Sequence, residues 1–170
     1  MTIPSLLVAS FMVLAPPAGK DARLAEAAMK RDTAAVRTLL EQKVDVNAPG
    51  KDGTPALHWV VRVDDVETAQ LLIRSGADVK LADRYGVTPL FLACSNGNAA
   101  MIKLLLDSGS DPNTVDPTGE TALMTAVKIG NLESVKLLLD RGAVVDTADP
   151  TYKQTALMIA AREDHYFFYP

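Results

Sequence analysis

The amino-acid sequence repeats itself every 33 residues. Equivalent leucines stand 33, 33, 33 and 34 residues apart, and two sets of glycines keep the same spacing. Several sets of equivalent residues, which we call columns, share this one period, and this predicts a stack of similar structural units. The units are expected to stack because a unit this short can bury its apolar face only against its neighbours. The leucine column is Leu24, Leu57, Leu90, Leu123 and Leu157, and the glycine columns are Gly53, Gly86 and Gly119, and Gly76, Gly109 and Gly142.

Residues 83–115 give the clearest unit. A turn over 83–86 ends in glycine and leads into Thr88-Pro89, where threonine suits a helix N-cap and proline the first helical position. We therefore expect a short helix over 90–95, a break at 96–98, and a second helix over 99–107 that carries an apolar stripe. Gly109 then ends the second helix in the left-handed conformation.

The motifs Gly-Val-Thr-Pro-Leu (86–90) and Gly-Glu-Thr-Ala-Leu (119–123), with Arg-Ser-Gly-Ala-Asp-Val (74–79), resemble the signatures of the ankyrin repeat. The resemblance covers about residues 22–164. It implies an all-α solenoid of stacked helix pairs with β-hairpin-like loops, built from about four complete repeats and a partial fifth. The expected repeat domain, 20–164, divides into units at about 20–50, 51–83, 84–116, 117–149 and 150–164.

Both ends of the array depart from the repeat. The first unit lacks the turn and has Arg31 and Lys43 where glycine is usual, and we interpret it as the N-terminal cap. The fifth unit carries one extra residue, has Lys153 in a glycine column, and is followed by an aromatic tail over 165–170. Such an end is expected to expose the outer face of the last units. Three explanations stay open: a truncated copy of a longer repeat protein, a tail folded back over the end, or an end that binds a partner.

Residues 1–19 contain no charged side chain, and 6–15 form an apolar run too short to span a bilayer. An apolar run followed by proline and small residues is typical of a signal peptide, although this one has no basic side chain before the run. We therefore expect an exported, bacterial type of protein, periplasmic or secreted, with no membrane span in the mature chain. Without a signal peptide the expected location is cytoplasmic, and the segment is a tail or a helix packed on the domain.

The composition and motifs exclude most kinds of chemistry. The net charge of −4 gives no sign of a basic surface for nucleic acid. One cysteine cannot form an internal disulfide, and two histidines cannot form a three-histidine metal site. No phosphate-binding loop is present. The resemblance implies a structural hydrogen bond for His58, while Cys94 lies in a column of small buried residues. Trp59 and Phe91 are interpreted as packing residues. We expect no enzyme activity, no cofactor and no metal.

We expect a non-enzymatic scaffold that binds another protein, monomeric unless the uncapped C-terminal end associates. The alternative is the regulatory repeat portion of a longer enzyme or receptor whose second domain is absent. The resemblance implies partner contacts at loop tips and at the ends of first helices, with Arg84 and Tyr85 the best candidates because Arg and Tyr dominate interface hot spots. Four cations (Lys51, Arg62, Arg84 and Lys128) are predicted to line one face and to favour an acidic partner. The full set of predicted contact residues is Lys51, Asp52, Thr54, Arg62, Val63, Arg84, Tyr85, Val87, Ser95, Asn96, Pro117, Thr118, Glu120, Lys128 and Ile129.

Overall fold

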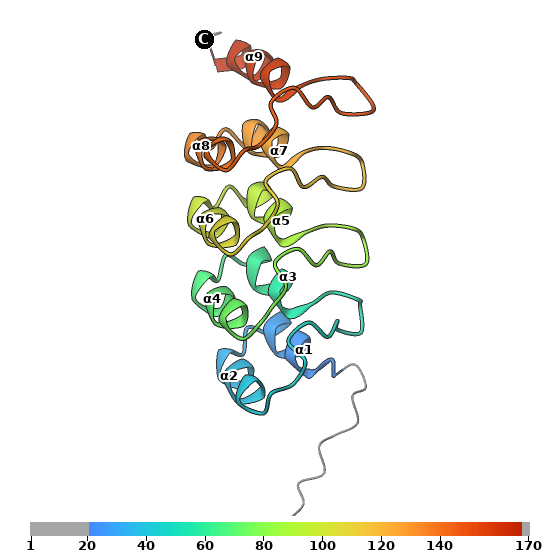
Figure 1. Cartoon of the computed structure of the whole chain (residues 1–170), viewed down its shortest axis with the longest axis vertical. Helices are drawn as coiled ribbons and strands as arrows, with labels where there is room; N and C mark the ends of the chain where they lie inside the picture. The colour runs from blue at the N-terminus through green and yellow to red at the C-terminus, as the bar shows by residue number, and fades with distance from the viewer. Residues whose placement is uncertain (1–20, 168–170) are drawn as a thin grey trace, which may run out of the picture.

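The computed structural model describes residues 21–167, and in this range helices stack in two parallel columns with loops projecting from one side (Figure 1). The odd-numbered helices form the column next to the loops, and the even-numbered helices form the outer column. The predicted signal segment 1–19 and residues 168–170 of the predicted tail lie outside the described residues. The helices are α1 (Arg23–Met29), α2 (Thr33–Glu41), α3 (Ala56–Arg62), α4 (Val66–Arg74), α5 (Pro89–Asn96), α6 (Ala99–Asp107), α7 (Ala122–Ile129), α8 (Leu132–Asp140) and α9 (Ala156–Phe167).

This architecture confirms the predicted all-α solenoid of four helix pairs and a partial fifth unit. The predicted bounds of α5 and α6 agree with the observed ones to within one residue. The described residues contain no named strand, and isolated β-bridges close the base of three loops, which are therefore hairpin-like as expected. The bridges join Pro49 to Pro55, Val115 to Thr121 and Ala148 to Thr155.

Short polar side chains fix where the helices begin. The Thr88 hydroxyl accepts a hydrogen bond from the backbone N–H of Phe91 at 3.3 Å, and Asn98 accepts one from that of Met101 at 3.0 Å. These bonds satisfy N–H groups that have no partner inside the helix. In the second unit Pro55 occupies the N-cap, so α3 begins without a side-chain cap.

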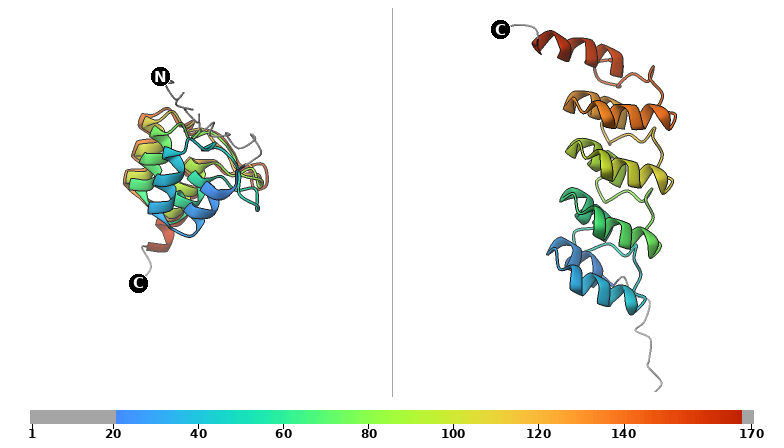
Figure 2. Two further views of the ribbon diagram at one scale, coloured as in Figure 1. Left: turned by 90° about the horizontal axis from the view of Figure 1, so that it is seen from below. Right: turned by 90° about the vertical axis from the view of Figure 1, so that its left-hand side faces the viewer.

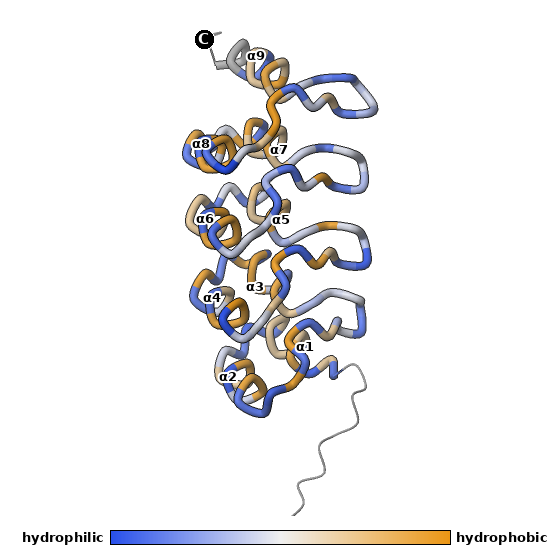
Figure 3. Tube along the Cα trace, viewed as in Figure 1, coloured by the Kyte–Doolittle hydropathy of each residue, from blue (hydrophilic) through white to orange (hydrophobic). Residues whose placement is uncertain are grey.

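The core is one continuous cluster of buried residues along the stack, and the apolar residues are concentrated in the helices (Figure 3). The leucine column lies at its centre, where Leu24, Leu57, Leu90 and Leu123 are at most 2% exposed. Leu157, in the same column, is 75% exposed. The core therefore runs from α1 to the inner side of α9.

Asparagine side chains tie neighbouring units together. The Asn47 amide donates to the Gly76 carbonyl at 3.1 Å, and its oxygen accepts from the backbone N–H of Asp78 at 2.8 Å. Asn113 makes the same two bonds to the unit that follows it. Because each asparagine satisfies both a carbonyl and an N–H of the next unit, these bonds fix the register of the stack.

Four non-glycine residues adopt the left-handed backbone conformation. Arg31, Lys43, Asp64 and Lys153 have φ between 56° and 59°, at columns where other units have glycine. The repeat therefore imposes its backbone on these side chains, at a cost of about 1–2 kcal/mol each.

Replacing Lys43 by glycine is expected to raise the free energy of unfolding by about 0.5–1 kcal/mol. Glycine removes the backbone strain of the left-handed conformation, and this gain is larger than the free-energy cost of giving the unfolded chain a more flexible residue. Urea denaturation followed by circular dichroism measures the change. Gln42→Gly is the matched control: Gln42 has φ −73°, so glycine there is expected to destabilise. A destabilised Lys43→Gly variant would show that this position carries no strain.

Helix α9 is longer than the other helices. It runs to Phe167 and so crosses the predicted boundary between the repeat domain and the tail at residue 164. Gly97 and Gly130 end α5 and α7 with φ of 69° and 75°, but no glycine or proline follows within α9. Helix α9 therefore continues past residue 164 because the sequence within it contains no residue that ends a helix.

Candidate protein-interaction surface

The predicted contact residues lie in two parts of the units, the loop tips and the C-terminal ends of the first helices α3, α5 and α7, and we call these parts together the inner surface. Seen along the stack, the loops gather on one side of both helix columns (Figure 2). The predicted contact residues come from these two parts. They can therefore be compared unit by unit.

Arg84 and Tyr85 form a stacked pair at the third unit's loop tip. The Arg84 guanidinium carbon lies 4.5 Å from the centroid of the Tyr85 ring, and both side chains are exposed. The buried Asp83 carboxylate accepts hydrogen bonds from the backbone N–H groups of Tyr85 at 2.9 Å and Val87 at 3.0 Å, which holds the turn. Because the turn is already fixed, a partner that contacts this pair has little ordering cost to offset.

A second stacked pair lies on α3, one unit before the first. The Arg62 guanidinium carbon lies 5.2 Å from the centroid of the Trp59 ring. Trp59 is half-buried and packs against the core, as predicted, but its ring also carries Arg62 on the exposed side. Sequence reasoning gave Trp59 only a packing role. The signal that links it to Arg62 is their spacing of three residues on a helix.

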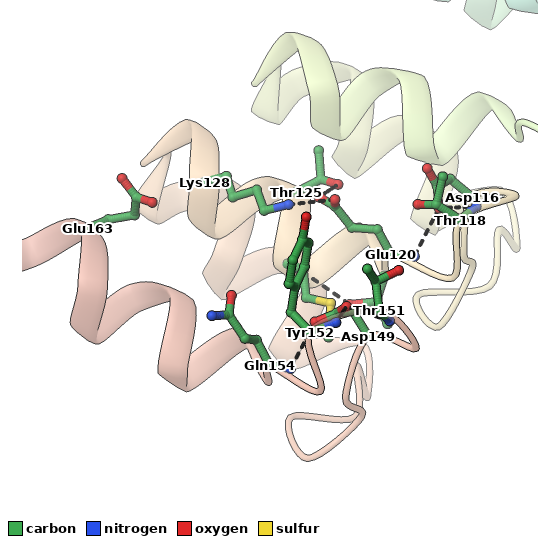
Figure 4. A network of polar contacts seen from close by, with 12 residues as sticks. Asp116, Thr118, Glu120, Thr125, Lys128, Asp149, Thr151, Tyr152, Gln154 and Glu163 are labelled. Carbon is green, nitrogen blue, oxygen red and sulfur yellow. Dashed lines mark hydrogen bonds and ion pairs between the residues drawn. The ribbon is translucent and has the colours of Figure 1, made fainter.

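A pocket of about 340 Å³ lies between the loops of the fourth and fifth units. In it Glu120 accepts a hydrogen bond from the Thr125 hydroxyl at 2.7 Å and pairs with the Lys128 ammonium at 2.5 Å (Figure 4). The structure thus brings together three predicted contact residues, Thr118, Glu120 and Lys128. The pocket is lined by Thr118, Glu120, Met124, Lys128, Asp149, Thr151, Tyr152, Gln154, Ile159 and Arg162.

Tyr152 and Arg162 belong to this pocket but were not among the predicted residues. Tyr152 is exposed, and its backbone N–H donates to the Asp149 carboxylate at 2.6 Å. This bond, with two further backbone N–H donors in the same loop, lowers the pKa of Asp149. The repeat register was the available signal: once the extra residue of the fifth unit is allowed for, Tyr152 is equivalent to Tyr85, and Arg162 to Arg62.

Several predicted contact residues are engaged within the fold. Thr54 is 3% exposed, so its side chain is withdrawn from a partner. The Asn96 amide donates to the Val61 carbonyl and to the Asp64 carboxylate, both at 3.0 Å, and thus links two units. We therefore leave Thr54 out of the surface and assign Asn96 a structural role. The half-buried members are Asp52, Val63, Val87 and Glu120, and the exposed members are Lys51, Arg62, Arg84, Tyr85, Ser95, Pro117, Thr118, Lys128 and Ile129.

Cys94 and His58 are both buried. His58 Nε2 lies 2.9 Å from the Val87 carbonyl oxygen, the structural hydrogen bond that the resemblance implied. Burial lowers the pKa of His58 and raises the pKa of the Cys94 thiol to about 12. A thiol with such a pKa is a poor nucleophile near neutral pH.

Cys94 in the native protein is expected to react with iodoacetamide at pH 8 at least about a hundredfold more slowly than in the urea-unfolded protein, because both its exposure and its thiolate fraction rise on unfolding. Mass spectrometry over a time course measures the two rates. Comparable rates would contradict the buried position of the thiol.

The described part of the chain contains no group of three or more His, Cys, Asp or Glu side chains placed to hold a metal ion. Among the described helices, none has the length and apolar character required to cross a membrane. The repeated carboxylates Asp45, Asp78 and Asp111 accept hydrogen bonds from backbone N–H groups two residues later, and these bonds hold the turns.

The comparison with protein families decides the identity of the repeat. The family model for ankyrin repeats (three copies) matches residues 24–116 and 101–168, which together make up most of the chain. The chain belongs to the ankyrin-repeat family. Ankyrin repeats are generally non-enzymatic modules for protein interaction.

One curated relative of this ankyrin-repeat chain is the ankyrin repeat and LEM domain-containing protein 1 homolog of Caenorhabditis elegans. The two are 50% identical over 44 residues, which is 26% of this chain and 6% of the relative. The match thus spans a small part of that protein's length. It supports the ankyrin assignment.

Proposed function

We propose that this chain is a non-enzymatic scaffold that binds another protein through its inner surface. The observation that carries the proposal is the pair of arginine–aromatic stacks in neighbouring units, Arg62 on Trp59 and Arg84 on Tyr85. Arginine and aromatic side chains are the residues most enriched at binding hot spots. Rigid repeats present them without a change of backbone conformation.

The charges of the inner surface favour an acidic partner. Lys51 pairs with Glu26 at 2.9 Å and Lys128 with Glu120, so these two cations are already neutralised. Within the described residues Arg62 and Arg84 form no ion pair. These two arginines are therefore available to attract carboxylates, and binding should weaken as the salt concentration rises.

Affinity capture from an extract of the host cells tests this function. The double variant Arg84→Ala, Tyr85→Ala is expected to lose most of the partner that the wild-type chain retains, since a hot spot contributes about 2 kcal/mol or more. The control is Leu132→Ala, Lys136→Ala, two exposed positions on α8 in the outer helix column, and it should retain the partner. Equal recovery by both double variants would exclude the assigned loop from the interface.

We also propose that residues 1–19 direct export from a bacterial cell, to the periplasm or the medium. The support is the uncharged apolar run over 6–15 and the proline and small residues that follow it. Sequencing the N-terminus of the protein from its host tests the proposal. A start near residue 16 to 20 is expected, and an intact Met1 in the cytoplasmic fraction would contradict it.

A further inference from the structure

Asn96 and Gly97 form the one asparagine–glycine pair in the sequence. The backbone nitrogen that follows an asparagine can attack the side-chain amide carbon, and glycine allows this attack most readily because it has no side chain to obstruct it. The pair lies at the end of α5, and Asn96 is exposed. Water therefore reaches the amide.

The Asn96 side chain belongs to the contact between the second and third units, which we call the junction. Its amide nitrogen donates to the carbonyl of Val61 and to the carboxylate of Asp64, both at 3.0 Å, and lies 3.4 Å from the carbonyl of Arg62. These three partners are all hydrogen-bond acceptors. The junction therefore needs the N–H groups of a neutral amide at this position.

The folded backbone opposes the attack. The N–H of Gly97 donates to the Cys94 carbonyl at 3.0 Å, and Gly97 has φ of 69° at the C-cap of α5. The bonds to the second unit hold the Asn96 amide away from its own main chain. Because the side chain must turn back onto that main chain to react, the junction bonds must break first.

We propose that Asn96 is a site of spontaneous deamidation that reacts only when the junction opens, and that the product keeps the junction weak. The nitrogen of Gly97 forms a bond to Cγ of Asn96, and the side-chain nitrogen leaves as ammonia. Water then opens the five-membered imide at either of its carbonyls, which gives aspartate or isoaspartate at position 96.

The product has the wrong chemistry for the junction. A carboxylate at position 96 donates no hydrogen bond, and it faces the carboxylate of Asp64 and the carbonyl of Val61. Like charges repel at this distance, and the acceptors lose their donor. Isoaspartate also adds a carbon atom to the main chain at the end of the helix. An opening that ends in reaction is therefore permanent.

Peptide mass spectrometry of the full chain, incubated in mildly alkaline buffer, follows the conversion of amide to acid. In urea Asn96 is expected to react at least about tenfold faster than in the native protein, and faster than Asn98, which precedes alanine. Leu90→Ala, which removes buried contacts of α5, should raise the native rate several-fold, whereas Leu157→Ala, at an exposed position, should not. Equal rates in the native protein and in urea, a native rate that Leu90→Ala leaves unchanged, or a reaction in urea no faster than at Asn98 would overturn the proposal.

The variant Asn96→Asp reproduces the product and tests its effect on the junction. It is expected to unfold at a lower urea concentration than the wild type. Asn98→Asp is the matched control with the same change of charge: Asn98 caps α6 by accepting from the backbone N–H of Met101, and aspartate caps a helix equally well. Equal urea midpoints for the two variants would overturn the weakening of the junction by the product.

Discussion

Replacing Leu90 by alanine is expected to lower the free energy of unfolding by about 2–5 kcal/mol. Leu90 is 1% exposed and lies in the middle of the leucine column, between the units on either side. Alanine removes its apolar contacts and leaves a cavity that flanking helices cannot fill without breaking the bonds that Asn96 and Asn113 make to the neighbouring units. Because each unit is stabilised by its neighbours, the loss is transmitted along the stack. Urea denaturation followed by circular dichroism measures it.

Leu157→Ala is the matched control for this substitution. It changes the same residue type in the same repeat column, but at the exposed position, and is expected to change the free energy of unfolding by less than about 0.5 kcal/mol in dilute solution. Equal costs at the two positions would show that the last unit is covered in the monomer. The exposure of Leu157 in the structure would then be wrong.

Gly119→Ala is expected to destabilise the protein by about 2–4 kcal/mol, through two separate effects. Gly119 has φ +83°, which a side chain disfavours, and a Cβ atom there would lie 2.6 Å from Cδ and Cγ of Pro150 in the next loop. The proline ring cannot move away without opening the stack of loops.

Gly142→Ala separates the two effects. Gly142 has φ +88°, but a Cβ atom there would meet nothing within 4 Å, so the expected cost is the backbone strain alone, about 1–2 kcal/mol. Thermal unfolding of both variants measures the difference. If Gly119→Ala is no more destabilised than Gly142→Ala, the loops do not pack as closely as the structure has them.

Most of the fold could be predicted from the sequence because the repeat supplies its own alignment. Residues in one column share one environment, so the burial of Leu57, Leu90 and Leu123 and the turns at Gly86 and Gly119 follow from the period. The same reasoning fails at the last described unit, where Leu157 has the residue type of its column but no described unit follows it. A leucine of this column is buried where the structure describes a following unit, as it does for Leu24, Leu57, Leu90 and Leu123.

The candidate surface could be predicted only in part. The loop tips and helix ends follow from the repeat, and with them Arg84 and Tyr85. The withdrawal of Thr54 and the pocket beside Tyr152 depend on distances between units, which a single period does not encode. The extra residue in the fifth unit also shifted Tyr152 and Arg162 out of the columns that would have identified them.

The most direct test of the inner surface is a binding titration of the captured partner by isothermal calorimetry. Arg62→Glu is compared with Lys136→Glu, which makes the same kind of charge reversal on the outer helix column. We predict that Arg62→Glu raises the dissociation constant at least about tenfold and that Lys136→Glu leaves it within about threefold of the wild type. Equal dissociation constants for the two variants would contradict recognition through the inner surface.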